Sequence, residues 1–280
     1  MRTGWRGFSA AVRLGWLTSS NWTQPLLFVI YQVLRPISAA LILAVMYSVI
    51  TGGRASARDY LAFLLVGTAF WSFVQEGMAE FSVGVLEDRG RFKMLKYTYL
   101  AMPSFPLYLV GRATSKLTSA AASTVIVLVL GTVFLRLPVN PLAIGYPMLI
   151  AACLVAFVAM VAFGIALSIL LLAARDGDHF GQISAQLLYV VSGAVFPITV
   201  LPGPLAAIAS VSPLVYWLEL CRRTILHGRV YQMFPTLSDG EVFTRLLLGT
   251  LGTVVLSFAV YRWADRRARR HGFIDMEANW

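Results

Sequence analysis

The amino-acid sequence predicts an all-α integral membrane protein: six transmembrane helices, an N-terminal interfacial helix and outer re-entrant helices before the last span. Composition is the first observation, because 58% of the residues are hydrophobic, 13% are charged and the mean hydropathy is +0.74. Too few polar side chains remain to cover a soluble globule. The second observation is the length of the apolar segments, since a hydrocarbon core of about 30 Å takes about 20 helical residues.

Residues 1–26 are predicted to form a cytoplasmic N-terminus with an interfacial amphipathic helix. One side of this helix would carry large apolar side chains beside three arginines: Trp5, Phe8, Val12 and Trp16, with Arg2, Arg6 and Arg13. Such a helix lies on the membrane surface, with Trp at headgroup depth and Arg facing anionic lipid.

Residues 27–263 are predicted to form the transmembrane domain. Its six spans are expected near 27–50, 60–83, 109–135, 144–173, 180–201 and 243–263. Between the last two lies an outer segment, 202–242, whose apolar first half contains Pro202, Pro204 and Pro213. Prolines this close break a continuous helix, so we expect short helices that dip into the membrane and return.

Basic residues orient the chain. Most of the 23 Lys and Arg residues would lie inside if the N-terminus is cytoplasmic, so both termini are predicted to be cytoplasmic, including a basic tail at 264–280. The net charge of +10 therefore reflects membrane topology, and we expect no nucleic-acid partner.

The patterns of common membrane enzymes are missing. The three histidines are too scattered for HExxH, and neither GxSxG nor GxxxxGK[ST] occurs. We therefore expect no catalytic residues, no metal and no cofactor on this chain. Cys153 and Cys221 form no CxxC and are expected to be unpaired. If ATP energises the protein, another polypeptide must bind the nucleotide.

Two polar groups lie within apolar regions. Glu76 and Glu80 share one face of the second span, which is compatible with a substrate or proton site, or with a pair to Arg112 or Lys116 near the interface. On the outer side, Glu219 has Arg222 at i+3 and Arg223 at i+4. This spacing predicts an intrahelical ion pair, with a substrate headgroup site as the alternative.

Two stretches carry a resemblance to a known family. The first, LEDRGRFKMLKYTYLAMPSFPLYLVGR, includes most of a loop at 84–108, and the second is FPITVLPGPLAAIASVSPLVYWLELCRR. Together with the topology they resemble the permease subunits of the ABC-2 family of ATP-binding-cassette exporters. The chain departs from the family pattern at Asp88-Arg89-Gly90-Arg91 and at Met102 before Pro103, which affects the contact chemistry.

The resemblance implies a half-transporter of the bacterial plasma (inner) membrane that dimerises with a second permease chain, as a homodimer or heterodimer. It further implies two cytoplasmic ATPase subunits that hold ATP and Mg²⁺. The coupling helix in the loop would contact an ATPase through Arg91, Lys93, Leu95, Lys96, Tyr97 and Tyr99. The translocation path would include Phe70, Trp71, Glu76, Glu80, Tyr189 and Phe196, and the outer gate Glu219 and Arg222.

The sequence thus favours a permease that exports an amphipathic substrate, such as a drug, a lipid or a lipid-linked glycan. One alternative is an integral membrane transferase acting on lipid precursors, which would need clustered acidic residues at one membrane face. The other is a proton-coupled carrier, which would need ionisable residues deep in the spans and an internal repeat.

Overall fold

The computed structural model describes residues 2–20, 57–89, 105–135, 137, 139–173, 180–226 and 231–270, with isolated positions between 30 and 49. All regular structure in these residues is helical, as predicted. The elements are α1 (Arg2–Ser20), α3 (Ala57–Arg89), α5 (Phe105–Leu135), α6 (Tyr146–Ala173), α7 (Phe180–Val191), the 3₁₀ turn η1 (Ile198–Val200), α8 (Gly203–Val211), α9 (Pro213–Leu226) and α10 (Asp239–Arg270).

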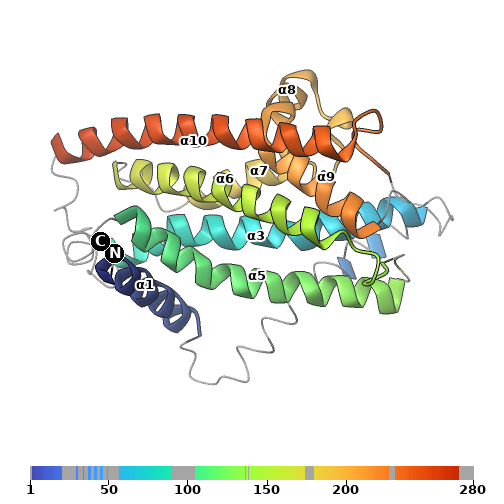
Figure 1. The fold of residues 1–280 in the computed structure, drawn as a ribbon, viewed down its shortest axis with the longest axis horizontal. Coiled ribbons are helices and arrows are strands. Elements are labelled where there is room, and N and C mark those ends of the chain that lie inside the picture. Colours follow the sequence, from blue (N-terminus) through green and yellow to red (C-terminus); the bar gives the residue numbers. More distant parts are fainter. Residues whose placement is uncertain are drawn as a thin grey trace.

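Four long helices, α3, α5, α6 and α10, run side by side and form the body of the molecule (Figure 1). α1 lies at the end of this bundle where α10 finishes, and α9 lies toward the opposite end (Figure 1). The N-terminal helix and α9 of the outer segment thus lie toward opposite ends of the bundle.

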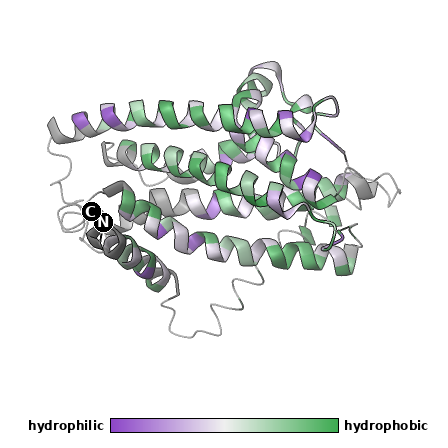
Figure 2. Cartoon of the chain, viewed as in Figure 1, coloured by the Kyte–Doolittle hydropathy of each residue, from purple (hydrophilic) through white to green (hydrophobic). Residues whose placement is uncertain are grey.

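Three helical stretches within the described residues are long and apolar enough to cross a membrane: Leu107–Phe134, Tyr146–Ser168 and Asp239–Ala264. They correspond to the predicted third, fourth and sixth spans, and Figure 2 shows green, hydrophobic residues along them. α3 covers the predicted second span but is not among the three. Most of the predicted first span, 27–50, lies outside the described residues.

The fifth predicted span is wrong in its second half. α7 ends at Val191, whereas a continuous helix was expected to residue 201. The chain then turns at Gly193, whose φ of +73° lies in the left-handed region that glycine adopts without strain. The physical cause is local, because this glycine and the proline at 197 both favour the end of a helix over its continuation.

The prolines break the outer segment as predicted. Pro202 is the N-cap of α8, Pro204 lies in its first turn, and Pro213 begins α9. The axes of α8 and α9 differ by 74°, which is compatible with a re-entrant loop or a broken span. Ser212 alone separates the two helices, so the bend is sharp, and we call residues 211–213 the elbow.

Several predicted boundaries lie within helices. α3 continues to Arg89 and α5 begins at Phe105, so both ends of the loop predicted at 84–108 are helical. α10 continues to Arg270, which makes the first part of the predicted tail at 264–280 a continuation of the last helix. The apolar pattern does not show the extension of α10, because the residues added after 263 are mostly charged.

Small residues allow α1 to pack closely on α5. A Cβ atom added to Gly111 would lie 2.7 Å from Cβ of Ala11, and one added to Gly15 would lie 2.5 Å from Oγ of Ser115. Ala11 is fully buried, whereas Trp16 is 47% exposed. The predicted N-terminal helix is therefore present, with a face of small residues fixed to the bundle.

The main core joins α3 to α6, α9 and α10. Trp217 of α9 is 1% exposed and makes edge contacts with the rings of Phe70 and Phe73 on α3. α3 is also tied to α5 by hydroxyl groups, since Thr124 Oγ1 donates to the Ala69 carbonyl at 2.8 Å. Interhelical hydrogen bonds of this kind help helices to associate where water is absent. The core thus fixes α9 against the long helices.

Candidate functional site

A buried arginine joins the outer segment to the bundle. Arg222 of α9 is 2% exposed, and its guanidinium donates to three backbone carbonyls on two other parts of the chain. Nε lies 3.1 Å from the Phe63 oxygen of α3, and Nη2 lies 2.8 Å and 2.9 Å from the oxygens of Gly193 and Ala194 after α7. We call this set of contacts the Arg222 clamp, because one side chain ties α9, α3 and the turn after α7 together.

Aromatic rings complete the clamp. The guanidinium carbon of Arg222 lies 3.5 Å from the centre of the Phe63 ring, a distance at which a cation and a ring attract each other. Phe63 stacks on Tyr60, whose hydroxyl donates to the Val195 carbonyl at 3.0 Å. Tyr231, beyond α9, approaches the same Phe63 ring edge-on. The charge is therefore buried among carbonyl dipoles and π faces.

The clamp needs a glycine on α3. A Cβ atom added to Gly67 would lie 2.2 Å from both the Ala194 oxygen and Nη2 of Arg222. Any side chain at this position would therefore push the turn or the guanidinium away from α3.

A second buried arginine holds the start of α10. Arg223 Nε pairs with Glu219 Oε1 at 3.0 Å, and Nη1 pairs with Asp239 Oδ1 at 2.9 Å. Its two terminal nitrogens also donate to the carbonyls of Leu237 and Phe234. The predicted intrahelical pair is thus present between Glu219 and Arg223 at i+4, while Arg222 at i+3 turns to the clamp.

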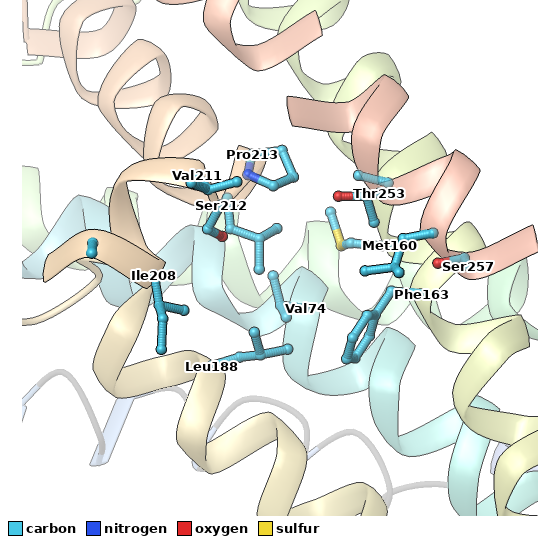
Figure 3. A pocket seen from close by; sticks show the side chains of 14 residues that line it. Val74, Met160, Phe163, Leu188, Ile208, Val211, Ser212, Pro213, Thr253 and Ser257 are labelled. Carbon is cyan, nitrogen blue, oxygen red and sulfur yellow. The ribbon is translucent and has the colours of Figure 1, made fainter. Parts of the chain in front are cut away.

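A partly enclosed pocket of about 570 Å³ lies beneath the elbow. Its wall comes from α3, α6, α7, α8, α9 and α10, and none of the described side chains that line it is charged. Figure 3 shows the lining side chains converging from several helices. The lining residues are Val74, Ala159, Met160, Phe163, Leu188, Ala207, Ile208, Val211, Ser212, Pro213, Leu214, Thr253, Leu256 and Ser257.

α10 packs directly on the elbow beside this pocket. A Cβ atom added to Gly249 would lie 3.2 Å from the Val211 oxygen and 3.4 Å from Cβ of Pro213. Because α10 packs this closely on the elbow, it holds the elbow residues that line the pocket in place. Thr253 and Ser257 follow on α10 within the candidate span Asp239–Ala264, so the pocket lies alongside that span.

The structure brings together only some of the residues predicted for a translocation path. Phe70 and Trp71 are 5% and 6% exposed within the core, and the Trp71 ring lies 5.1 Å from that of Tyr189. Phe196 is 50% exposed beyond the end of α7. Glu76 is half-buried on α3, and Glu80 lies one turn later on the same helix. Their roles in a path remain predictions.

The residues predicted to contact an ATPase, Arg91, Lys93, Leu95, Lys96, Tyr97 and Tyr99, lie outside the described residues. Both cysteines are free, as expected. Within the described part of the chain, no three His, Cys, Asp or Glu side chains come together as metal ligands.

Sequence reasoning missed the partners of Arg222. Phe63 and Gly67 lie in an apolar run, and the carbonyls that accept from the guanidinium belong to the backbone. The only signal was the pair of glycines at 67 and 193, which indicates close backbone approach but not the partner. Asp239 was also missed, since sixteen residues separate it from Arg223.

Comparison with known proteins places these features in a family. The model of the ABC-2 type transporter family matches residues 8–226, from α1 to the end of α9, which is well over half of the chain. No curated protein matches the chain. The match includes Arg222 with the carbonyls and the Phe63 ring that it contacts, the elbow and most of the pocket lining, whereas Tyr231 lies beyond the matched residues. The matched region is a transport subunit with no ATPase domain. The chain therefore belongs to the ABC-2 type transporter family.

Proposed function

We propose that this chain is the permease subunit of an ATP-driven exporter that moves an amphipathic substrate, such as a drug, a lipid or a lipid-linked glycan, out across the plasma membrane. The family match over residues 8–226 carries the proposal. It is supported by a sequence with no GxxxxGK[ST] motif of its own, so the nucleotide must be bound by a partner ATPase.

The membrane topology that we propose has six spans, both termini in the cytoplasm and a bacterial inner-membrane location. Three candidate spans and a bent pair of helices support a multi-pass protein. The distribution of Lys and Arg supports the orientation, since the basic end of α10 and α1 lie at one end of the bundle (Figure 1).

The assembly that we propose contains two permease chains, identical or different, and two cytoplasmic ATPase subunits that bind ATP and Mg²⁺. The coupling surface is the segment containing Arg91, Lys93, Leu95, Lys96, Tyr97 and Tyr99. ATP-driven closure of the ATPase pair would push on this segment and bias the long helices between two arrangements.

The outer gate is the α8–α9 pair, held shut by the Arg222 clamp. Three hydrogen bonds and a cation–π contact from one guanidinium tie α9 to α3 and to the turn after α7. Glu219 supports the gate indirectly, because it pairs with Arg223 rather than with Arg222. Opening the gate would break only these non-covalent contacts, which can form again when the gate closes.

Co-purification tests the proposal. The full chain is co-expressed with candidate ATP-binding-cassette ATPases and isolated through a tag on the permease. We expect one ATPase to remain bound, and the double variant Leu95→Glu, Tyr99→Glu to lose it while still inserting into the membrane. An apolar side chain replaced by a carboxylate cannot stay seated in a protein cleft without a large desolvation cost.

The matched control replaces Leu247 and Leu248, which are 44% and 63% exposed on α10, with alanine. This change leaves the cytoplasmic loop intact, so the ATPase should remain bound. If every candidate ATPase is absent from the wild-type preparation, the proposed function is wrong. If the double variant retains the ATPase and its stimulation, the coupling surface is misplaced.

A further inference from the structure

We propose that the pocket beneath the elbow is a binding site for an uncharged amphiphile: an apolar chain that carries a single hydroxyl or carbonyl group. This site would name the chemical class of the exported substrate. Only the identification of the bound amphiphile as that substrate rests on the proposed function. The binding itself is measured without an ATPase.

The size of the pocket fits a chain rather than a solvent molecule. At about 570 Å³ it exceeds several-fold the cavity of about 150 Å³ that stays dry and takes benzene in another protein. It also falls in the range of about 300–1,000 Å³ that small-molecule sites occupy. An apolar void of this size gains from an apolar occupant, because empty space leaves the lining without contacts.

The pocket is continuous with the surface that faces lipid. Three of its lining side chains are strongly exposed: Leu256 on α10 at 67%, and Ile208 and Val211 on α8 at 61% and 73%. Because α10 is a candidate span, an opening beside Leu256 faces acyl chains rather than water. A ligand dissolved in the bilayer can therefore enter sideways between α8 and α10.

The lack of charged side chains in its described lining excludes most lipid headgroups from the pocket. None of the lining residues in the described part of the chain is charged, and burying an ion without a partner in this setting is costly. A phosphate, a carboxylate or an ammonium group would find no counter-ion among these side chains. The occupant must therefore be uncharged in the part that enters.

Two hydroxyl groups predict a polar group on the occupant. Ser257 is 6% exposed, and neither its hydroxyl nor that of Ser212 has a hydrogen-bond partner in the described part of the chain. Thr253 differs, because its hydroxyl donates to the Gly249 carbonyl at 2.8 Å. Figure 3 shows Ser212 and Ser257 on opposite sides of the pocket. Neither oxygen is among the fully buried polar atoms, so both remain open to an occupant, and a ligand hydroxyl or carbonyl that bonds to one of them is favoured over a pure hydrocarbon.

Photolabelling tests the site. The full chain is reconstituted in lipid nanodiscs with a long-chain alcohol that carries a diazirine, and the labelled peptides are identified by mass spectrometry. Three matched probes have the same chain and diazirine but end in a methyl, a carboxylate or a quaternary ammonium group. We expect the alcohol to label pocket residues of α6 and α10 at low concentration, and the charged probes to label them far less.

Adjacent leucines give a matched pair of filling variants. Leu188 lines the pocket, whereas its neighbour Leu187 is 64% exposed and does not. Leu188→Trp should abolish labelling of the pocket, and Leu187→Trp should leave it unchanged. Ile208→Trp, at the exposed rim, fills the entrance from α8 and gives the same expected loss if Leu188→Trp fails to fold.

The serines test the polar group. Ser257→Ala should reduce labelling by the alcohol about tenfold, as the loss of one hydrogen bond of about 1.4 kcal/mol implies, and leave the methyl-terminated probe unchanged. Ser210→Ala is the control, since its hydroxyl is exposed, donates to the Ala207 carbonyl and lies outside the pocket.

Each outcome decides the proposal. Labelling that spreads evenly over lipid-facing residues and ignores Leu188→Trp would overturn the site. Equal labelling by the charged probes, or a response of the methyl-terminated probe to Ser257→Ala, would overturn the proposed chemical class. Absence of labelling because a second permease chain covers the pocket would overturn it as well. Since no ATPase is present, these failures leave the co-purification result untouched, and the reverse also holds.

Discussion

At the scale of single residues, the outer segment depends on two neighbouring arginines with different partners. Arg222 donates to backbone carbonyls and lies over Phe63, whereas Arg223 pairs with two carboxylates. A lysine could carry either charge, but it lacks the planar fork that reaches several acceptors at once. The two positions therefore stabilise different junctions, one with α3 and one with the start of α10.

Gly67→Ala tests the clamp. The added Cβ would lie 2.2 Å from Nη2 of Arg222, so the contacts must shift, and overpacking of this kind costs about 1–3 kcal/mol. We expect a lower midpoint of thermal unfolding in detergent. Gly252→Ala on α10 is the control, because nothing lies within 4 Å of its added Cβ. An equal midpoint for wild type and Gly67→Ala would contradict the clamp geometry.

The two carboxylates bound by Arg223 should contribute unequally. Glu219 has no exposed side-chain surface, whereas the Asp239 side chain is 61% exposed. Breaking a buried pair costs about 3–5 kcal/mol, while an exposed pair contributes about 0–1 kcal/mol. We expect Glu219→Gln to lower the unfolding midpoint clearly and Asp239→Asn to change it little. The opposite order would show that the ion pair with Asp239 holds the segment.

At the scale of elements, the elbow is fixed by its contact with α10. Gly249 lets α10 approach Pro213 closely enough that a Cβ added at 249 would lie 3.4 Å from the proline Cβ. This separation is near the range of about 3.5–4.5 Å between Cβ atoms in disulfides. The contact therefore offers a way to lock the α8–α9 pair to the last helix.

The locking variant is Pro213→Cys, Gly249→Cys in a chain whose native cysteines at 153 and 221 are replaced with alanine. Under a mild oxidant we expect a crosslink, seen by mass spectrometry, and a loss of ATP-driven transport that a reductant reverses. Pro213→Cys with Gly252→Cys is the control, since nothing lies near position 252. Transport that continues with the crosslink formed would show that the elbow does not move against α10.

The elements also show what sequence can and cannot predict. The breaks at Pro202 and Pro213 follow from proline chemistry, and the long apolar helices follow from length and hydropathy. The i+3 and i+4 arginines were equally able to pair with Glu219. Only tertiary packing decides between them, because the carbonyls that accept from Arg222 lie 28 to 159 residues away in the chain.

The pocket illustrates the same limit. Its wall is assembled from six helices, and each contributes apolar residues that look like ordinary membrane-facing positions in the sequence. Ser257 is one of several serines in apolar runs, and its lack of a partner appears only when the neighbouring helices are in place. A periodic pattern reports the face of one helix and carries no information on the space between helices.

At the scale of the whole molecule, the chain divides into a membrane body and two places where force would act. The proposed coupling segment would receive it, and the α8–α9 pair with its clamp would respond. The C-terminal end of α3, which precedes this segment in the chain, lies toward the end of the bundle opposite α9 (Figure 1). α3 connects them, because it runs from the clamp at Phe63 toward the loop that follows Arg89. A change at one end of such a rigid element biases the contacts at the other.

The most direct test of this account is the native mass of the detergent-solubilised complex, measured together with its ATP hydrolysis. We predict two permease chains and two ATPase subunits, with hydrolysis that disappears when the ATPase's own nucleotide site is inactivated and no hydrolysis by the permease alone. A permease that purifies as a monomer, binds no ATPase and yet moves a substrate would contradict the account.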